Sequence, residues 1–95
     1  AAKNMTATAY TAGHGGADSC TATGTSVRVG TVAVDKRVIP LGTRMYIVTN
    51  DGRVVYGMAV AEDTGVRGNV VDLYYDTYQQ CISFGRRGCT VYLLK

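Results

Sequence analysis

The sequence lacks tryptophan and contains a single phenylalanine, so large aromatic side chains contribute little to any deep core. It also lacks a run of about 18 apolar residues, which excludes a helix that spans a membrane. The first residues carry neither the charged nor the apolar region of a signal peptide, so we expect none within this sequence. With one histidine and no C-x-x-C pair, the chain offers few of the ligands that zinc prefers, and we expect neither a metal nor a cofactor.

The residues that are present are typical of a small globular protein. A chain of 95 residues suits one domain, which we expect to extend over residues 1–95. Hydrophobic residues make up 46 % and charged residues 18 %, which favours a folded chain over a disordered one. The seven tyrosines are amphipathic and suit a wet groove or a barrel surface. The net charge of +3 suits an anionic surface, but it is too small and too scattered to indicate nucleic acid as a partner.

Short strand patterns fill most of the chain. We expect strands at residues 6–12, 29–35, 44–48, 54–63, 70–75 and 89–94. Thr49-Asn50-Asp51-Gly52 predicts a hairpin turn between the third and the fourth. Residues 76–85 predict a short helix, with Asp76 as the N-cap, Gln79 in a capping box and Gly85 at the end. Many short strands in a small chain favour an all-β closed barrel, which has no exposed sheet edge.

Seven acidic side chains are candidates for chemistry, and four of them have an ordinary structural role. These four are Asp18 in a glycine-rich loop, Asp51 in the hairpin turn, Asp76 at the helix start, and Glu62, which strand alternation points away from its neighbour Asp63. Asp35, Asp63 and Asp72 remain. Each follows an apolar or small stretch, and none has a comparable turn or cap role.

Asp63 and Asp72 lie on either side of residues 64–69, a short loop with two glycines that is able to bring the two carboxylates together. Alternation predicts a face of mostly small residues around Asp63, shared with Val55, Gly57, Ala59 and Ala61. A buried carboxylate either accepts hydrogen bonds from loop N–H groups and pins a turn, or it has a perturbed pKa and does chemistry. The residues alone favour the first role for Asp35 and leave both roles open for the other two.

Six segments of the chain occur in the order found in one bacterial family. They are ATAYTA, TATGT, VGTVAVDKRVIPLGTRMYI, AEDTG, GNVVDLYY and FGRRGCTVYLL. The chain resembles the 3D domain, named for three aspartates, of bacterial cell-wall proteins of the stationary-phase-survival and resuscitation type. It is also similar to the C-terminal part of MltA-type lytic transglycosylases. The resemblance covers nearly the whole chain, although the segment DTGVRGNVVD is two residues shorter than the usual loop of the family.

This resemblance implies a six-stranded double-psi β-barrel with one short helix. It also implies a lytic transglycosylase that cleaves peptidoglycan glycan strands between N-acetylmuramic acid and N-acetylglucosamine and leaves 1,6-anhydro ends. The three named aspartates correspond to Asp35, Asp63 and Asp72. Asp72 corresponds to the general acid and Asp63 to its partner, while we expect Asp35 to tie its turn to the barrel. The candidate sugar contacts are Tyr10, Thr23, Thr25 and Arg67.

Other functions stay open beside this one. A double-psi barrel of the expansin-like type grips glycans without cleaving them, and a glycoside hydrolase also uses two carboxylates. His14, Asp18 and Cys20 lie close enough in sequence for a metal site, but a single histidine in a glycine-rich loop argues against it. Cysteine-nucleophile chemistry is disfavoured because His14 is the one available base and nothing places it beside a thiol.

The resemblance also places the chain outside the cell, in the bacterial wall, where disulfides persist. Of the three cysteines, at most one pair can form within the chain. We expect the pair Cys81–Cys89, with Cys20 left as a free thiol, although Cys20 could replace either partner. The sequence makes no prediction about the oligomeric state.

Overall fold

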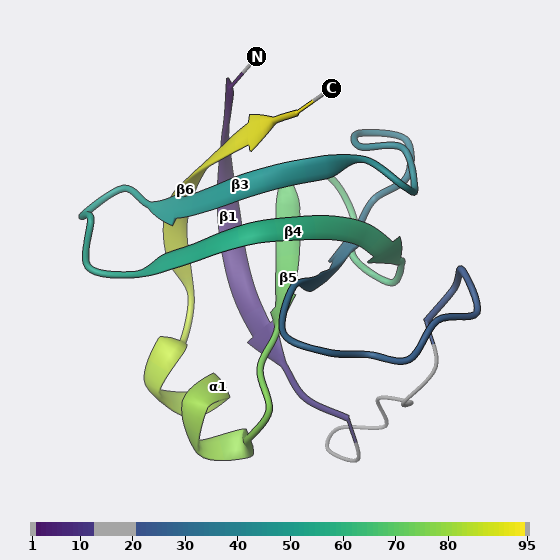
Figure 1. Ribbon diagram of the computed structural model, residues 1–95. Helices are drawn as coiled ribbons and strands as arrows, with labels where there is room; N and C mark the ends of the chain where they lie inside the picture. Colours follow the sequence, from purple (N-terminus) through teal and green to yellow (C-terminus); the bar gives the residue numbers. More distant parts are fainter. Residues whose placement is uncertain (1, 13–20, 95) are drawn as a thin grey trace.

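The computed structural model describes residues 2–12 and 21–94, and within them six strands close into a barrel (Figure 1). Around the barrel the strands follow the order β1-β5-β2-β4-β3-β6, and β6 pairs with β1. They are β1 (Ala2–Tyr10), β2 (Thr31–Val34), β3 (Arg44–Thr49), β4 (Val55–Asp63), β5 (Val70–Tyr74) and β6 (Arg87–Leu93). One short helix, α1 (Tyr78–Phe84), lies in the connection from β5 to β6.

Two strand pairs of the described barrel are parallel. They are β1 with β5 and β2 with β4, and the other four pairs are antiparallel. Strands that run parallel cannot be joined by a tight hairpin, so the chain must cross the barrel ends between them. The connections at residues 35–43 and 64–69 link strands that are not neighbours in the barrel, β2 to β3 and β4 to β5. Asp35 begins the first connection, Asp63 directly precedes the second, and Asp72 is the third residue of β5.

The barrel interior is filled by small and branched side chains. Alternation points Val32 and Val34 of β2 inward, where they are fully buried, and leaves Ala33 between them on the outer face. Ile39, from the β2–β3 connection, is also fully buried and covers the core from one end. The core cluster comprises Met5, Ala7, Val32, Val34, Ile39, Met45, Ile47, Ala59, Ala61, Val71, Leu73, Phe84, Cys89 and Val91.

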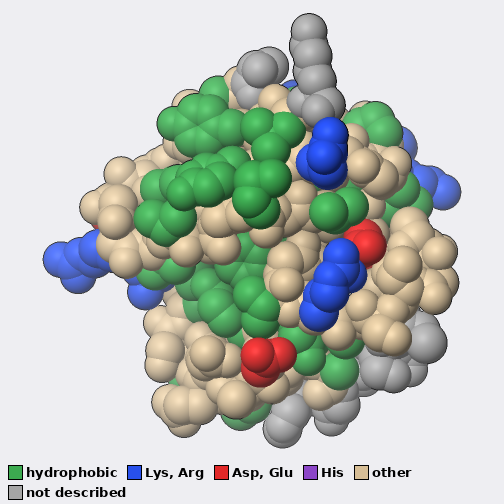
Figure 2. Space-filling model, in the orientation of Figure 1, with side chains coloured by type: hydrophobic (Ala, Val, Ile, Leu, Met, Phe, Trp, Pro, Cys, Tyr) green, Lys and Arg blue, Asp and Glu red, His purple; other side chains and the backbone are tan. Residues whose placement is uncertain are grey.

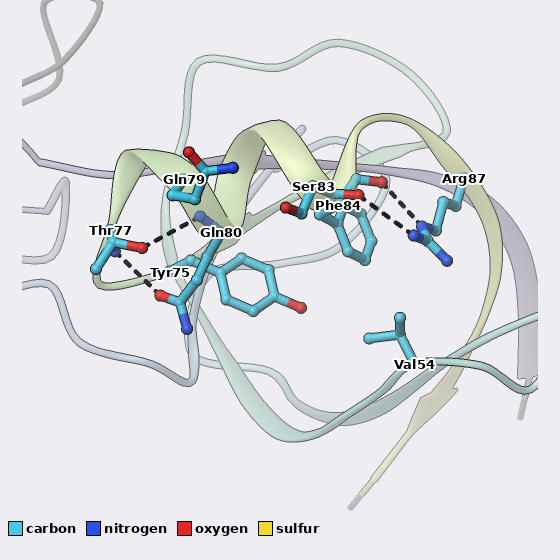
Figure 3. A pocket seen from close by; sticks show the side chains of 8 residues that line it. All are labelled: Val54, Tyr75, Thr77, Gln79, Gln80, Ser83, Phe84 and Arg87. Carbon is cyan, nitrogen blue, oxygen red and sulfur yellow. Dashed lines mark hydrogen bonds between the residues drawn. The ribbon is translucent and has the colours of Figure 1, made fainter.

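Helix α1 begins one residue later than the sequence indicates. Its N-cap is Thr77 rather than Asp76, and the capping box is completed by Gln80 rather than Gln79. The threonine hydroxyl accepts from the N–H three residues on, and the glutamine side chain accepts from the Thr77 N–H, which satisfies two amides at the helix start. Gly85 ends the helix with φ = 66°, as the sequence predicts. Figure 3 shows this capping box and the Arg87 guanidinium at the opposite end of the helix.

The hairpin between β3 and β4 forms where the sequence predicts it. The Gly52 N–H donates to the Thr49 carbonyl at 2.9 Å, and the Thr49 N–H donates to the Val54 carbonyl at 2.9 Å. Asp51 accepts from the Thr49 hydroxyl at 2.7 Å and from the Arg53 N–H at 2.9 Å. The carboxylate of Asp51 therefore stabilises its own turn.

Hydrophobic side chains gather on the outer face over β3 and β4 (Figure 2). Tyr46 of β3 pairs with Met58 of β4 on one side and with Tyr92 of β6 on the other, so the three side chains form a row across the strands. All three are exposed by more than a third of their surface. Within the described residues, no helix has the length and apolar character that crossing a bilayer requires.

The expected disulfide between Cys81 and Cys89 is wrong, because both residues are free thiols. Cys89 is fully buried in the core cluster with Val91, while Cys81 is half-buried on α1. Alternation on β6 therefore points the Cys89 sulfur into the barrel interior. Burial raises the pKa of the Cys89 thiol to about 11, so it stays protonated and behaves as a small apolar side chain. Cys20 lies outside the described residues.

Candidate functional site

Asp72 and Asp63 are brought together by strand pairing across three strands, β5, β2 and β4. Asp72 pairs with Thr8 of β1 on one side and with Ala33 of β2 on the other, and Ala33 pairs in turn with Asp63 of β4. Paired residues of neighbouring strands point to the same face of a sheet. The row Thr8, Asp72, Ala33, Asp63 therefore lies on the outer face, with the smallest side chain between the two carboxylates. Their Cα atoms are two strand spacings apart, roughly 9–10 Å.

A β-bulge sets which acid of β4 joins this row. Val32 pairs with Ala61, but the next residue of β2, Ala33, pairs with Asp63 instead of Glu62. The extra residue turns Asp63 to the outer face. The expectation that Asp63 shares a face with Ala61 and the other small residues of β4 is therefore wrong, since Ala59 and Ala61 point into the core.

Asp72 is a half-buried carboxyl with one strong contact. The Thr8 hydroxyl donates to Asp72 Oδ1 at 2.8 Å, and Oδ2 has no hydrogen-bond partner within residues 2–12 and 21–94. Burial raises the pKa of Asp72 above its usual range, and the nearby Asp63 carboxylate raises it further, while the Thr8 hydrogen bond opposes both. Burial is thus a larger cause of the shift than the second aspartate. A proton on Asp72 is stabilised, and Oδ2 is the oxygen free to carry it.

Asp63 is held by backbone amides at the end of β4. Its Oδ1 accepts from the Ala22 N–H at 3.0 Å and from the Thr64 N–H at 2.9 Å. These contacts tie the turn at residues 21–25 to the end of β4. Within that turn the hydroxyls of Thr21, Thr23 and Thr25 lie 2.7–3.3 Å from one another. The predicted sugar contacts Thr23 and Thr25 therefore lie exposed beside Asp63.

Tyr10 shares this outer face, two residues beyond Thr8 on β1 and opposite Tyr74 of β5. Its ring packs edge-on against that of Tyr74, with ring centroids 5.6 Å apart. The Tyr10 hydroxyl is buried and finds no hydrogen-bond partner in the part of the chain that the structure describes. Burial, followed by the charges of Asp63 and Asp72, raises the pKa of Tyr10. The phenol consequently keeps its proton and stays a hydrogen-bond donor beside the two carboxylates.

Asp35 is engaged by hydrogen bonds to two segments. Its carboxylate accepts from the Arg37 N–H at 3.0 Å, from Arg37 Nε at 3.1 Å and Nη2 at 3.0 Å, and from the Gly68 N–H at 2.9 Å. Arg37 first, and then the Gly68 amide, lower the pKa of Asp35 well below its usual range. The contacts fasten the loop at residues 64–69 to the end of β2. The structure thus places Asp35 as an anchor of the loop, apart from the row of Asp63 and Asp72.

Arg67 is exposed on the same loop. It lines a pocket of about 370 Å³ together with Lys36 and Arg37. No hydrogen bond or ion pair joins Arg67 to Asp63 or Asp72, all three of which the structure describes. The structure therefore brings Tyr10, Thr23 and Thr25 to the carboxylate pair and leaves Arg67 in a neighbouring pocket.

Sequence reasoning missed the role of Glu62. Glu62 is buried and accepts from Arg28 Nη1 at 2.7 Å and from the Thr31 hydroxyl at 2.9 Å. These bonds hold residues 28–31 against the end of β4, next to Asp63. Arg28 lies 34 positions away in the chain, so no local pattern could have indicated the pair.

No group of three histidine, cysteine, aspartate or glutamate side chains suited to a metal ion occurs among the residues that the structure describes. His14, Asp18 and Cys20, the candidate metal ligands in the sequence, lie outside that part of the chain.

The pKa values of Asp35 and Asp72 are shifted in opposite directions. Replacing each aspartate with the neutral asparagine should therefore change the stability of the fold in opposite directions. A carboxyl with a lowered folded-state pKa stabilises the fold above its unfolded pKa of about 3.9, and one with a raised pKa costs stability there. At pH 7 we expect Asp35→Asn to be less stable and Asp72→Asn more stable than the wild type. Urea unfolding from pH 3 to pH 7 should show the Asp72 difference vanish at the acid end. The Asp35 difference should begin to shrink below about pH 3.9 but persist at pH 3, because Asp35 stays ionised in the folded chain well below its usual range. Changes of the same sign in the free energy of unfolding of the two variants at pH 7 would contradict these environments.

The fold resembles those of two kinds of solved protein. E. coli MltA with bound chitohexaose matches with a TM-score of 0.64 and 21 % identity, covering 86 % of this chain and 29 % of that one. An apo expansin from Clavibacter michiganensis matches with a TM-score of 0.67 and 17 % identity, covering 100 % of this chain and 51 % of that one. At such identities these likenesses concern the fold, and the expected six-stranded double-psi barrel with one short helix is confirmed.

The family follows from the sequence matches. The 3D domain family matches residues 30–95, and the cell wall-binding protein YocH of Bacillus subtilis (strain 168) is 38 % identical over 96 residues. The chain therefore belongs to the 3D domain family. It covers 31 % of the length of YocH, with 95 % of its own residues aligned.

Proposed function

We propose that this chain is a lytic transglycosylase domain that acts on the glycan strands of bacterial peptidoglycan, outside the cell. The observation that carries the proposal is the row formed by strand pairing, in which a carboxyl with a raised pKa, Asp72, lies across Ala33 from a second carboxylate, Asp63. Similarity of the fold to MltA, which was solved with a bound sugar oligomer, supports the substrate class.

The reaction needs one carboxyl that acts first as an acid and then as a base. Protonated Asp72 gives its proton to the glycosidic oxygen as the bond from that oxygen to C1 of the muramic sugar breaks. The Asp72 carboxylate then takes the proton of the C6 hydroxyl of the same sugar as O6 bonds to C1. The products are a strand with a 1,6-anhydro end and a strand with a free hydroxyl, and Asp72 is protonated again. The same switch from acid to base operates in retaining glycosidases, where water takes the place of the C6 hydroxyl.

The surroundings of Asp72 support both halves of this cycle. Burial keeps the carboxyl protonated to a higher pH than a solvated aspartate, which the acid step requires. Asp63, whose carboxylate is held by two amides on the same outer face as Asp72, would stabilise the positive charge that develops on C1 of the sugar in the transition state. Tyr10 offers a protonated hydroxyl, and Thr23 and Thr25 offer exposed hydroxyls, for hydrogen bonds to sugar oxygens.

Digestion of purified peptidoglycan tests the proposal. The chain should release muropeptides with 1,6-anhydro ends, identified by chromatography and mass spectrometry through the loss of one water relative to hydrolysed ends. Reducing ends in place of anhydro ends would indicate a hydrolase, in which water enters the reaction. Products of neither kind from a folded chain would refute catalysis by this domain.

A second candidate is a wall-binding module without catalysis. It is favoured by the name of the relative YocH, a cell wall-binding protein that matches 95 % of this chain. In that case the carboxylates and hydroxyls on the outer face would accept and donate hydrogen bonds to glycan hydroxyls without proton transfer. Co-sedimentation with purified sacculi, with no soluble product after long incubation, would support binding alone.

A further inference from the structure

A pocket of about 370 Å³ opens between the β2–β3 connection and the loop that follows β4. One wall is formed by residues 34–37 and the other by residues 64–67. Its volume lies in the range of small-ligand sites, which is larger than a bare inorganic ion needs. Thr64 in the second wall donates its N–H to Asp63, so the pocket adjoins the Asp63 end of the carboxylate pair.

The pocket carries an excess of positive charge. Asp35 and Arg37 neutralise each other through two side-chain hydrogen bonds. The Gly68 N–H donates a further hydrogen bond to the Asp35 carboxylate. Lys36 and Arg67 are exposed, and neither makes an ion pair with any residue in the ranges 2–12 and 21–94. Two cations are therefore available at the rim, and the one acid lining the pocket is already paired.

A second pocket, beside α1, differs in this respect (Figure 3). It also contains an arginine, but Arg87 Nε donates to the Phe84 carbonyl at 2.8 Å and Nη2 donates to the Ser83 carbonyl at 3.4 Å. The same guanidinium lies over the Phe84 ring, 5.2 Å from its centroid. The cation of that pocket thus stabilises the end of the helix, whereas Lys36 and Arg67 make no such contact within the described residues.

We propose that Lys36 and Arg67 form a subsite for a carboxylate carried by the stem peptide of a peptidoglycan strand whose sugars lie at Asp63 and Asp72. This assignment rests on the proposed glycan-binding function. The amino groups of the sugars are acetylated and uncharged, and where a stem peptide is attached the carboxyl of the muramic sugar is taken up in the amide bond to it. The ionised acidic groups of such a unit are therefore those of its peptide. A guanidinium binds a carboxylate through two parallel hydrogen bonds, and an ammonium adds a point charge.

The test measures binding in the Asp72→Asn background, so that cleavage does not alter the ligand. Soluble glycan-peptide fragments are compared with the same fragments after their carboxylates have been converted to amides. We expect amidation to weaken binding about tenfold, which corresponds to the loss of a charge-assisted hydrogen bond. Arg67→Gln should weaken binding of the carboxylate form by a similar factor and change binding of the amidated form by less than about twofold, and Lys36→Gln should do the same to a smaller extent.

Arg53→Gln is the matched control. Arg53 is exposed in the turn before β4, at the opposite end of that strand from Arg67, and its substitution removes the same charge. If Arg53→Gln and Arg67→Gln weaken binding equally, net charge rather than a subsite is responsible, and the proposal is wrong.

Two further outcomes would also overturn the subsite. If Arg67→Gln weakens the binding of the carboxylate and the amidated fragments equally, Arg67 contacts the sugars. Binding that ignores amidation but depends on phosphate polymers left on crude walls would assign the pocket to a phosphodiester. Because binding is measured without cleavage, a chain that binds as expected yet produces no anhydro ends leaves the subsite intact and refutes only the transglycosylase.

Discussion

Asp72→Asn is expected to abolish the release of 1,6-anhydro ends from peptidoglycan, with a loss of about 100- to 10,000-fold in rate, the usual contribution of a general acid. Asparagine keeps the shape of the side chain and can still accept the Thr8 hydroxyl hydrogen bond at its oxygen. It has no proton to give to the glycosidic oxygen and cannot accept one from the C6 hydroxyl. The measurement is the initial rate of anhydro-muropeptide formation under matched enzyme and substrate concentrations.

The control for this variant is Asp76→Asn, four residues further along the chain. Asp76 is exposed beyond the end of β5, and its replacement removes the same charge without touching the outer-face row. It should retain the wild-type rate. Both variants should still bind sacculi, which distinguishes a loss of catalysis from a loss of glycan binding. Unchanged anhydro products from Asp72→Asn would remove Asp72 from the mechanism.

Leu73→Ala should be the most destabilising of the substitutions considered for this chain, by about 2–5 kcal/mol. Leu73 is fully buried in the barrel core and pairs with Val32 of β2, next to the pair of Asp72 with Ala33. Truncation leaves a cavity in a small core and lowers the free energy of unfolding by a large part of the total expected for a domain of this size. Urea unfolding at pH 7 measures the difference.

Ile82→Ala gives the reference for this measurement. Ile82 is a large aliphatic residue on α1 that is 58 % exposed, so its truncation removes little buried surface. We expect a change within about 0.5 kcal/mol. Comparable losses from both substitutions would contradict the assignment of Leu73 to the core. Because Leu73 adjoins Asp72, Leu73→Ala should also lower catalytic rate by loosening the row at temperatures where the chain is still folded.

The sequence predicts the elements whose signals are local. The hairpin turn requires only the neighbours of Asp51 and Gly52, and both its position and its hydrogen bonds agree with the structure. The helix is predicted as an element, but its cap is displaced by one residue, since Asp76 and Thr77 are both good N-caps and the reciprocal contact of Gln80 decides between them.

The candidate site depends on contacts that no local pattern contains. Alternation assumes an unbroken strand, so it assigned Asp63 to the face of Ala59 and Ala61 and could not anticipate the bulge that turns it outward. The same assumption hid Glu62, whose partners come from a distant segment. The role of Asp35 was easier, because one of its partners, Arg37, is only two residues away.

The pairing of β1 with β5 also has a consequence for how the chain folds. Thr8 and Asp72 are 64 positions apart, and in the row they belong to no two neighbouring strands are consecutive in sequence. Proteins dominated by such distant contacts fold slowly, in about milliseconds to seconds, because the loops must close before the contacts stabilise them. Until the barrel closes, Asp72 is a solvated aspartate with an ordinary acidity. The burial that raises the pKa of Asp72 arises only in the completed fold, so an immature chain carries the residue without the environment on which the proposed chemistry depends.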